Sequence, residues 1–339
     1  MSKTTFRIVI FGAGSVGCYL GGRLLSAGAD VVMVGRPRMQ AVLEANPLVV
    51  TDYEGYRFHS QLDKTQYADS AKAVAGADLI LVTVKSAATG EAGTQLAPWV
   101  SAGTPVVSLQ NGLSNALTLK RALPNATVLA GMVPFNVLQQ QPGHFHQGTE
   151  GHLMAEQHPA LENALPWFDK AGLPLEPRPD MESVMWSKLL LNLNNPINAL
   201  SGVPLLEELS QRNYRRCLAM AQRETLQLLK AASIPTVNLT GVPMALIPPL
   251  MTAPDWLFKR LAQKMLTIDP VARSSMWEDL QAGRPTEIDW INGEVVALAA
   301  RLGSTAPINR KLVELVHQRE HEPLSWSAEQ LIEVLKNAI

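Results

Sequence analysis

A glycine-rich turn close to the N-terminus constrains the fold of this chain more than any other feature of its sequence. Residues 12–17 read Gly-Ala-Gly-Ser-Val-Gly, a G-x-G-x-x-G pattern. The apolar, β-branched run Arg7–Phe11 precedes the turn and predicts a strand that is buried on both faces. A helical pattern over Ser15–Ala27 follows, and Val31–Gly35 is predicted as the next buried strand. This succession is the unit from which parallel sheets are built.

The three glycines have separate roles in such a turn. Gly12 would make the tight bend, Gly14 would let backbone approach a pyrophosphate, and Gly17 would let the helix pack on the strand. The helix N-terminus would supply N–H groups and a positive dipole end to the anion. Packing alone can also produce a glycine-rich turn, but the succession of strand, turn, helix and strand favours dinucleotide binding. The cofactor-binding candidates are Gly12, Ala13, Gly14, Ser15, Val16 and Gly17.

The end of the second strand distinguishes between two dinucleotides. An Asp or Glu at this point would accept a hydrogen bond from a ribose 2′-hydroxyl and favour NAD. The sequence has Gly35-Arg36-Pro37-Arg38 instead, without a carboxylate. A guanidinium suits a 2′-phosphate through charge-assisted hydrogen bonds, so Arg36 predicts NADP. The alternative is that Arg36 is a solvated loop cation.

Strand-like runs continue through the first half of the chain. Most are β-branched and lack charge, and helix-length connections separate them, which predicts a parallel, doubly wound sheet. The runs are Leu79–Val84, Thr104–Leu109 and Thr127–Gly131. Short segments near Gly143–Gln147 and Gly151–Ala155 are predicted as antiparallel additions to the same sheet.

Strand patterns end after the Pro-rich stretch Leu173–Asp180, and helical periodicity takes over. The predicted helices are Met181–Leu200, Leu205–Ala232, Trp256–Met265, Ser274–Ala282 and Glu287–Arg301. We therefore expect a Rossmann-type α/β domain over residues 1–179, followed by an all-helical domain over residues 180–339.

Two further strand ends carry candidate ligand contacts, because ligands of such sheets bind at the carboxyl ends of the strands. Lys85 follows one predicted strand and could meet a cofactor phosphate. Asn111 follows the next and offers both a donor and an acceptor near the nicotinamide. Asn111 is also followed by Gly112, and Asn-Gly is a common turn dipeptide, so both interpretations stay open.

Lys188 is the most informative residue of the helical half. At about 100° per residue, Asn192 and Asn195 would share its helix face, while leucines occupy the rest of the helix. A buried lysine is costly unless it has a partner or a function. Reduction of a carbonyl provides such a function, because an ammonium can stabilise and protonate the developing alkoxide. The alternative is a lysine that extends to solvent, with asparagines that cap a helix end before Pro196.

A second polar group follows the predicted helix end at Ala282-Gly283-Arg284-Pro285. Thr286 and Asp289 have the spacing of a helix N-cap, which would leave Glu287 in an ordinary first turn. Ser274-Ser275-Met276 lies shortly before this group.

Composition excludes several classes of function. Lys and Arg total 29 against 30 Asp and Glu, so the chain lacks the basic excess that nucleic acid or an anionic membrane requires. Two cysteines cannot form a disulfide framework and fit a reducing cytoplasm. No apolar run approaches the ~20 residues of a membrane span. His144 and His146 lack a third ligand, so no metal is expected. Charged residues are only 17% of the chain, which suggests that part of the surface is covered by another domain or subunit. The apolar segment Ile234–Pro270 could form such an interface, so a homodimer is possible.

Taken together, these motifs resemble the ketopantoate reductase (2-dehydropantoate 2-reductase) family over nearly the whole chain. The resemblance is carried by the glycine turn, Val84-Lys85-Ser86, Gln110-Asn111-Gly112, Trp186-x-Lys188-x-x-x-Asn192, Ser274-Ser275-Met276 and Thr286-Glu287-Ile288-Asp289. It implies NADPH-dependent reduction of ketopantoate to pantoate, on the route to pantothenate and coenzyme A. It also implies an active site between a Rossmann domain and a helical domain.

The resemblance assigns roles to individual residues. Lys188 would be the general acid, and Glu287 would orient it, bind the substrate hydroxyl and contribute to the cofactor site. The residues implied to hold the substrate are Asn111, Asn192, Asn195 and Ser275. Arg36 and Lys85 would meet the adenosine phosphate. Asn195 lies seven residues after Lys188, where the family commonly has eight, so Asn194 and Asn198 compete for its role.

Other functions remain to be distinguished. Related enzymes with this fold reduce other branched 2-keto acids. A 3-hydroxyacid dehydrogenase also joins a Rossmann domain to helices and uses a lysine, but the Ser274–Met276 and Thr286–Asp289 pair disfavours it. A non-catalytic NADPH-sensing protein would have no use for the set Lys188, Asn192, Ser275 and Glu287.

Overall fold

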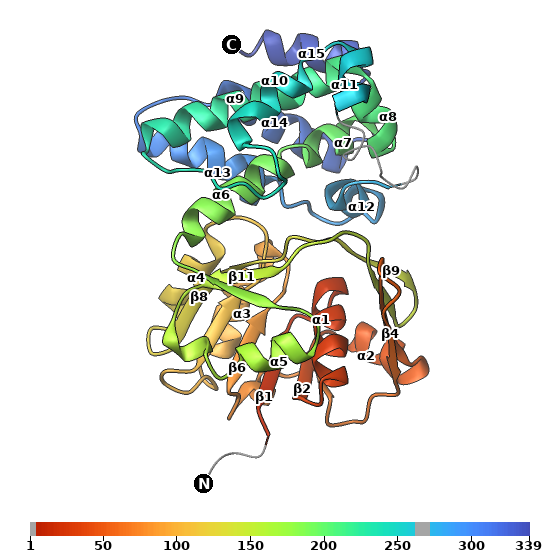
Figure 1. Ribbon diagram of the computed structural model, residues 1–339, viewed down its shortest axis with the longest axis vertical. Helices are drawn as coiled ribbons and strands as arrows, with labels where there is room; N and C mark the ends of the chain where they lie inside the picture. Colours follow the sequence, from red (N-terminus) through yellow and green to blue (C-terminus); the bar gives the residue numbers. More distant parts are fainter. Residues whose placement is uncertain (1–4, 262–271) are drawn as a thin grey trace. The chain divides into compact units, whose positions relative to one another are not determined.

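The computed structural model describes residues 5–261 and 272–339, which form two compact units, Met1–Met181 and Glu182–Ile339 (Figure 1). Within the first unit, a mixed sheet of eight strands is the largest element, in the order β12-β11-β8-β7-β6-β1-β2-β5. Its strands are β1 (Arg7–Phe11), β2 (Asp30–Val34), β5 (Tyr67–Ala68), β6 (Leu79–Val82), β7 (Pro105–Ser108), β8 (Thr127–Met132), β11 (Leu153–Glu156) and β12 (Leu175–Arg178).

Six neighbouring strands of this sheet, from β5 through β8, run parallel, as the doubly wound prediction requires. Their order reverses between β1 and β6, and in open α/β sheets such a reversal marks the ligand-binding crevice at the carboxyl ends of the strands. β11 then adds antiparallel to β8. The predicted antiparallel addition at Gly151–Ala155 is therefore confirmed.

The prediction for Gly143–Gln147 is wrong. This segment contains β10 (His144–Gln147), which belongs to a separate four-stranded sheet in the order β4-β3-β10-β9. The other strands are β3 (Leu48–Asp52), β4 (Arg57–Ser60) and β9 (Val137–Gln141). β10 pairs parallel with β3, whose residues lie 95 positions earlier, and no local pattern can specify a partner at that distance.

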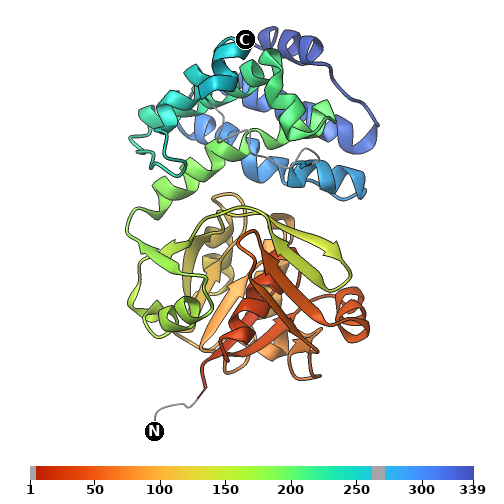
Figure 2. The same cartoon turned by 45° about the vertical axis from the view of Figure 1, so that its right-hand side comes forward.

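Helix α1 (Ser15–Ser26) lies beside the small sheet and packs on β2 of the large one (Figure 2). Two of its glycines permit the close approach: a Cβ atom at Gly21 would lie 2.7 Å from Met33 Sδ, and one at Gly22 would lie 2.6 Å from Val50 Cγ1. The remaining helical elements of this unit are α2 (Pro37–Ala45), η1 (Ala71–Val74), η2 (Ser86–Ala88), α3 (Thr89–Leu96), α4 (Asn115–Ala122), η3 (Pro159–Leu161) and α5 (Leu165–Lys170).

The second unit contains helices and no strand among its described residues. Its helices are α6 (Met181–Asn192), α7 (Asn195–Ser201), α8 (Leu205–Ser210), α9 (Arg212–Ala231), η4 (Met244–Leu246), α10 (Ile247–Met251), α11 (Asp255–Leu261), α12 (Ser275–Gln281), α13 (Ile288–Arg301), α14 (Pro307–His321) and α15 (Ala328–Lys336). α6 begins one residue before the unit boundary. Within the described residues, no helix is both long and apolar enough to cross a membrane.

Two predicted helices are each divided in two. The predicted helix Met181–Leu200 is interrupted between α6 and α7, because Pro196 has no N–H to continue the ladder of α6. The predicted helix Leu205–Ala232 is interrupted at Gln211, which is extended. There the Arg215 guanidinium donates to Leu209 O at 2.8 Å and satisfies a carbonyl near the end of α8.

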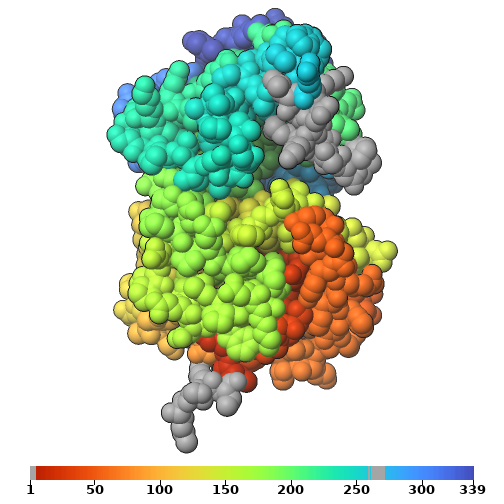
Figure 3. Space-filling view, in the orientation of Figure 1, coloured from red at the N-terminus to blue at the C-terminus, as the bar shows by residue number. Residues whose placement is uncertain are grey.

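The segment between α9 and α11 lies on the surface of the second unit (cyan in Figure 3). Buried Arg215 anchors its end, because the guanidinium donates to Met251 O, Ala253 O and the Asp255 carboxylate. Of the predicted helix Trp256–Met265, α11 covers residues 256–261, and the rest lies outside the described residues.

Candidate active site

The glycine turn joins β1 to α1 and has no room for a side chain at its first or last glycine. Gly12 has a φ of +123°, and a Cβ atom there would lie 2.5 Å from Val84 N. A Cβ atom at Gly17 would collide with the carbonyl oxygen of Gly12. At Gly14, by contrast, a Cβ atom would have no heavy atom within 4 Å. Packing therefore requires Gly12 and Gly17, whereas Gly14 faces open space that a ligand could enter.

The N-terminus of α1 suits an anion. Gly14 is the N-cap without a side-chain hydrogen bond, and the first turn of the helix contains no acidic residue. Backbone N–H groups at such a helix end carry partial positive charge and bind phosphate groups. Gly12 and Ala13 both donate their N–H to Val34 O at 2.9 Å, which fixes the turn against the end of β2.

The carboxyl end of β2 gathers positive charge. Arg36 is the N-cap of α2 and, like Arg38, is exposed. The Tyr67 hydroxyl of β5 donates to Arg36 O at 3.0 Å and holds the backbone at this point. A guanidinium and the positive end of a helix dipole therefore occur together, with no carboxylate in the first turn of α2.

A buried polar network fixes the loops that follow β6 and β7. Ser86, which follows Lys85, donates its hydroxyl to Asn111 O at 2.8 Å. This hydrogen bond ties the loop after β6 to the loop after β7. The Thr89 hydroxyl lies 2.7 Å from Asn115 Oδ1 and accepts a hydrogen bond from Gln110 Nε2 at 2.6 Å. The loops that carry Lys85 and Asn111 therefore meet at the edge of the sheet where β1 ends.

In the second unit, Lys188 lies on α6 among buried apolar side chains. Trp186, Leu189 and Leu190 are buried, and Lys188 itself is half-buried. Burial disfavours the ammonium form and lowers the pKa of Lys188 from its ordinary value of 10.5 to about 8. This amine can therefore exchange a proton close to neutral pH.

The predicted asparagines divide between two helices. Asn192 is the last residue of α6, one turn after Lys188 and on the same face. Asn195 is the first residue of α7. The single helix face that was predicted for Lys188, Asn192 and Asn195 is therefore wrong for Asn195, because the helix does not continue through Leu193 and Asn194.

Asn198 is fully buried, and its side-chain amide is occupied by protein groups. Its Nδ2 donates to Glu208 Oε2 at 2.7 Å and to Val203 O at 3.0 Å, while its Oδ1 accepts from Ser274 N at 2.8 Å. Burial raises the pKa of Glu208 to about 8, although hydrogen bonds from Asn198 and Asn194 oppose this. Asn194 and Asn198 therefore both face Glu208, which makes Asn195 the better substrate candidate of the three.

Ser275 is the exposed first residue of α12, and Ser274 is the N-cap. Ser274 Oγ accepts from Trp277 N at 3.2 Å and lies 3.3 Å from Asn195 O. Ser274 therefore joins the starts of α7 and α12, so the structure brings the predicted substrate residues Asn195 and Ser275 into one neighbourhood.

Glu287 is buried and is itself the N-cap residue of α13. No side chain caps this helix, and Thr286 Oγ1 accepts only a long hydrogen bond of 3.4 Å from Ile288 N. The Asp289 carboxylate contacts His317 Nε2 at 3.0 Å instead. The predicted N-cap of Thr286 with Asp289 is therefore wrong.

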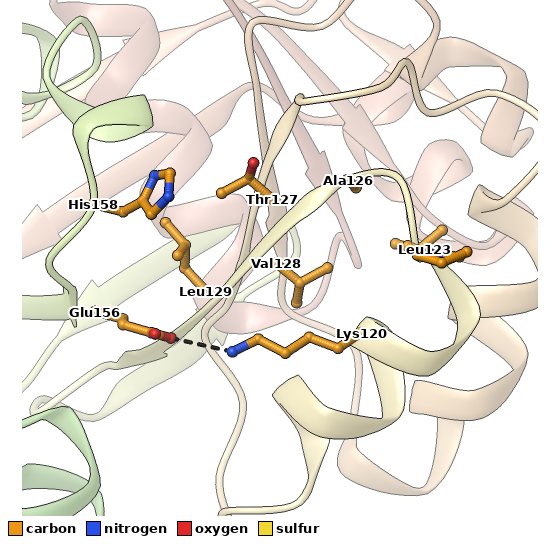
Figure 4. A pocket seen from close by; sticks show the side chains of 9 residues that line it. Lys120, Leu123, Ala126, Thr127, Val128, Leu129, Glu156 and His158 are labelled. Carbon is orange, nitrogen blue, oxygen red and sulfur yellow. Dashed lines mark hydrogen bonds and ion pairs between the residues drawn. The ribbon is translucent and has the colours of Figure 1, made fainter.

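A shallow cavity of about 280 Å³ lies elsewhere on the first unit (Figure 4). It is lined in part by Lys120, Glu156 and His158, and Lys120 Nζ lies 3.5 Å from Glu156 Oε2. Thr127, the first residue of the parallel strand β8, also lines it. The cavity is therefore near the start of a strand, whereas the glycine turn lies where β1 ends, and it is separate from the candidate cofactor site.

Among the described residues, no three His, Cys, Asp or Glu side chains gather to hold a metal ion. His144 and His146 each lie 2.8 Å from Thr51 Oγ1.

Sequence reasoning missed several polar residues that position the site. Thr89, Asn115 and Glu208 are buried, and each has a hydrogen-bond partner that lies 10 or more residues away along the chain. Small polar side chains carry no periodic signal, so only their burial in the structure identifies them.

Comparison with known proteins agrees with this organisation. The family model "Ketopantoate reductase PanE/ApbA" matches residues 8–159, and "Ketopantoate reductase PanE/ApbA C terminal" matches residues 180–320. The chain belongs to the ketopantoate reductase family.

Individual relatives are similar over almost their whole length. The 2-dehydropantoate 2-reductase of Pyrococcus horikoshii is 25% identical over 93% of this chain and 97% of its own. A PanE/ApbA family ketopantoate reductase from Ralstonia eutropha superimposes with a TM-score of 0.79 and 30% identity, over 93% of this chain and 99% of that chain. A D-mandelate dehydrogenase bound to NADH and anilino(oxo)acetate shares the fold, with a TM-score of 0.73 and 19% identity, over 93% of this chain and 99% of that chain.

Proposed function

We propose that this protein is an NADP-dependent 2-dehydropantoate 2-reductase, which reduces ketopantoate to pantoate for pantothenate and coenzyme A synthesis. The observation that carries the proposal is a lysine with a pKa of about 8 in a chain of this family, whose relatives are named for that reaction. The two buried cysteines, both free thiols, are compatible with a cytoplasmic location.

The first unit fits the diphosphate and adenosine part of a dinucleotide. The open space at Gly14 and the uncapped N-terminus of α1 suit the pyrophosphate. Exposed Arg36 and Lys85 suit the 2′-phosphate of the adenosine, and Asn111 would contact the nicotinamide end. The nicotinamide, when bound, supplies the hydride.

The second unit supplies the proton and holds the substrate. Negative charge develops on the ketone oxygen as the carbonyl carbon is reduced, and the Lys188 ammonium stabilises this charge and transfers its proton to the oxygen. We propose that Glu287 orients Lys188 and binds the substrate hydroxyl. Asn192, Asn195 and Ser275 would hold the hydroxyl and carboxylate of the substrate.

Oxidation of NADPH, followed by absorbance, tests the proposal when ketopantoate is compared with other 2-keto acids. We expect the highest kcat/KM with ketopantoate. Turnover equal to that of a reaction without substrate, across the whole panel, would refute the reductase and leave a non-catalytic NADPH-sensing protein.

A second candidate is a reductase of another branched 2-keto acid. This chain shares its fold with a D-mandelate dehydrogenase, so the fold also occurs in an enzyme that acts on another 2-hydroxy acid. A higher kcat/KM with an aromatic or longer branched 2-keto acid than with ketopantoate would select this candidate.

A further inference from the structure

Glu320 on α14 binds the residue that directly precedes Glu287. Thr286 donates its backbone N–H to Glu320 Oε1 at 2.7 Å, and its side chain also forms a hydrogen bond with this carboxylate. Thr286 is buried, and Glu320 is largely buried, with 16% of its side chain exposed. A hydrogen bond to a charged acceptor in such surroundings is stronger than one between neutral groups.

His317 links Glu320 to Asp289, which lies two residues after Glu287 in the sequence. Its Nδ1 lies 2.9 Å from Glu320 Oε2, and its Nε2 lies 3.0 Å from Asp289 Oδ1. The Glu320 carboxylate, followed by that of Asp289, raises the pKa of His317 above its ordinary value of 6.5. Burial raises the pKa of Glu320, but hydrogen bonds from His317 and Thr286 outweigh it and lower that pKa overall. The two carboxylates therefore favour the imidazolium form of His317.

The backbone at Glu287 needs such an external support. Glu287 is the N-cap of α13 and makes no side-chain cap hydrogen bond, and Thr286 Oγ1 supplies only the long hydrogen bond from Ile288 N. α13 packs against α14 (Figure 1), and Glu320 and His317 hold the residues immediately before and shortly after Glu287. Glu320 and His317 of α14 therefore restrain the segment that carries Glu287.

We propose that Glu320, assisted by His317, is a positioning residue that holds Glu287 in its catalytic orientation. This inference rests on the proposed function, in which Glu287 orients Lys188. Glu320 and His317 would act through Thr286 and Asp289 rather than by contact with substrate or cofactor.

Kinetics of variants test the proposal. In Glu320→Ala, we expect kcat to fall by about 10- to 100-fold, because a small displacement of a catalytic group has that effect. The KM for NADPH should change much less than kcat, because most of the proposed cofactor contacts lie on the first unit. Glu320→Gln keeps an acceptor for Thr286 N–H and should restore most of kcat. The matched control is Glu314→Ala, which removes an exposed carboxylate of α14 that pairs with Lys311.

A double-mutant cycle separates positioning from general support of the fold. If Glu320 acts through Glu287, Glu320→Ala should have little further effect on kcat in a Glu287→Gln background. Equal losses in both backgrounds, or a kcat of Glu320→Ala equal to that of Glu314→Ala, would overturn the proposal.

Amide hydrogen exchange of the ligand-free protein tests the same point without activity. Relative to the wild type, we expect faster exchange of the peptide that covers residues 286–292 in Glu320→Ala, and exchange close to the wild-type rate in Glu320→Gln and Glu314→Ala. Unchanged exchange in Glu320→Ala would overturn the proposal even in an active enzyme. If the wild-type protein reduces no 2-keto acid, the proposed function fails, and the exchange result still decides whether Glu320 holds this segment.

Discussion

At the scale of single residues, the environment of Lys188 decides what the side chain can do. The α6 segment around it is rich in leucine, and burial brings the pKa of the amine down to about 8. A general acid is most effective when its pKa lies near the working pH. The same burial lowers the stability of the folded protein, because the amine binds its proton more tightly in the unfolded chain. A buried lysine without a function would therefore only destabilise the fold.

The pH dependence of turnover follows from this lowered pKa. Below about pH 8 the ammonium form of Lys188 predominates, and above it the proton donor is lost. We therefore expect kcat for ketone reduction to fall as the pH rises through about 8, measured with saturating NADPH in buffers of constant ionic strength. A kcat that stays level until about pH 10, where an ordinary lysine titrates, would contradict this assignment.

Removal of the amine tests its role directly. Lys188→Ala should lower kcat by about 100- to 10,000-fold, the usual contribution of a general acid. The affinity for NADPH, measured by fluorescence titration, should stay nearly unchanged. Lys311→Ala is a suitable control, because it removes a lysine from a surface pair of the same unit. Full activity of Lys188→Ala would exclude Lys188 as the acid.

At the scale of elements, the glycine turn allows a matched comparison of two substitutions. Gly17→Ala places a Cβ atom against the Gly12 carbonyl and should destabilise the protein by about 1–3 kcal/mol, as overpacking does. Gly14→Ala meets no protein atom and should leave the melting temperature unchanged while NADPH binding weakens. Thermal unfolding and NADPH titration of both variants check this. Normal binding by Gly14→Ala would remove the turn from the cofactor site.

The β2–α2 junction should determine the preference between cofactors. Arg36→Glu replaces a cation with an anion and should weaken NADPH binding by roughly 10- to 100-fold, equivalent to about 1.5–3 kcal/mol. NADH lacks the 2′-phosphate, so its binding should change much less. The ratio of kcat/KM for the two cofactors measures this, and an unchanged ratio would mean that another group binds the phosphate.

Helix boundaries show where local patterns stop being informative. The apolar periodicity of α6 continues into α7, and that of α8 into α9, so the sequence alone predicts two continuous helices. The first break depends on Pro196. The effect of a proline is local, and a helix end before Pro196 was one of the two alternatives that the sequence left open. The second break depends on Arg215, whose side chain binds the Leu209 carbonyl and the segment around Met251, a tertiary contact without a local signal.

At the scale of the whole molecule, the apolar segment from η4 to α11 carries a prediction about self-association. Leu246 and Trp256 are exposed by 56% and 69%, which is unusual for large apolar side chains. We propose that this surface contributes to a homodimer. Sedimentation velocity should then give a mass about twice 36.9 kDa for the wild-type protein and a shift towards monomer for Trp256→Glu. A monomeric wild-type protein would contradict the proposal.

The sequence by itself determined the features that depend on neighbouring residues. The glycine turn, the buried parallel strands on either side of it, and the change from strand to helix near residue 180 are all local patterns, and the structure contains each of them. Lys188 could be named as a candidate from residue type and spacing along the chain, whereas the candidate role of Glu287 came from the resemblance to the family.

Only the tertiary structure decided what depends on residues far apart in the chain. It placed β10 beside β3 in a second sheet, turned Asn194 and Asn198 towards Glu208, and brought Glu320 and His317 of α14 to the backbone around Glu287. It also produced the lowered pKa of Lys188. These outcomes share one physical reason: burial and pairing arise when distant segments pack together, and single polar residues leave no periodic trace in the sequence.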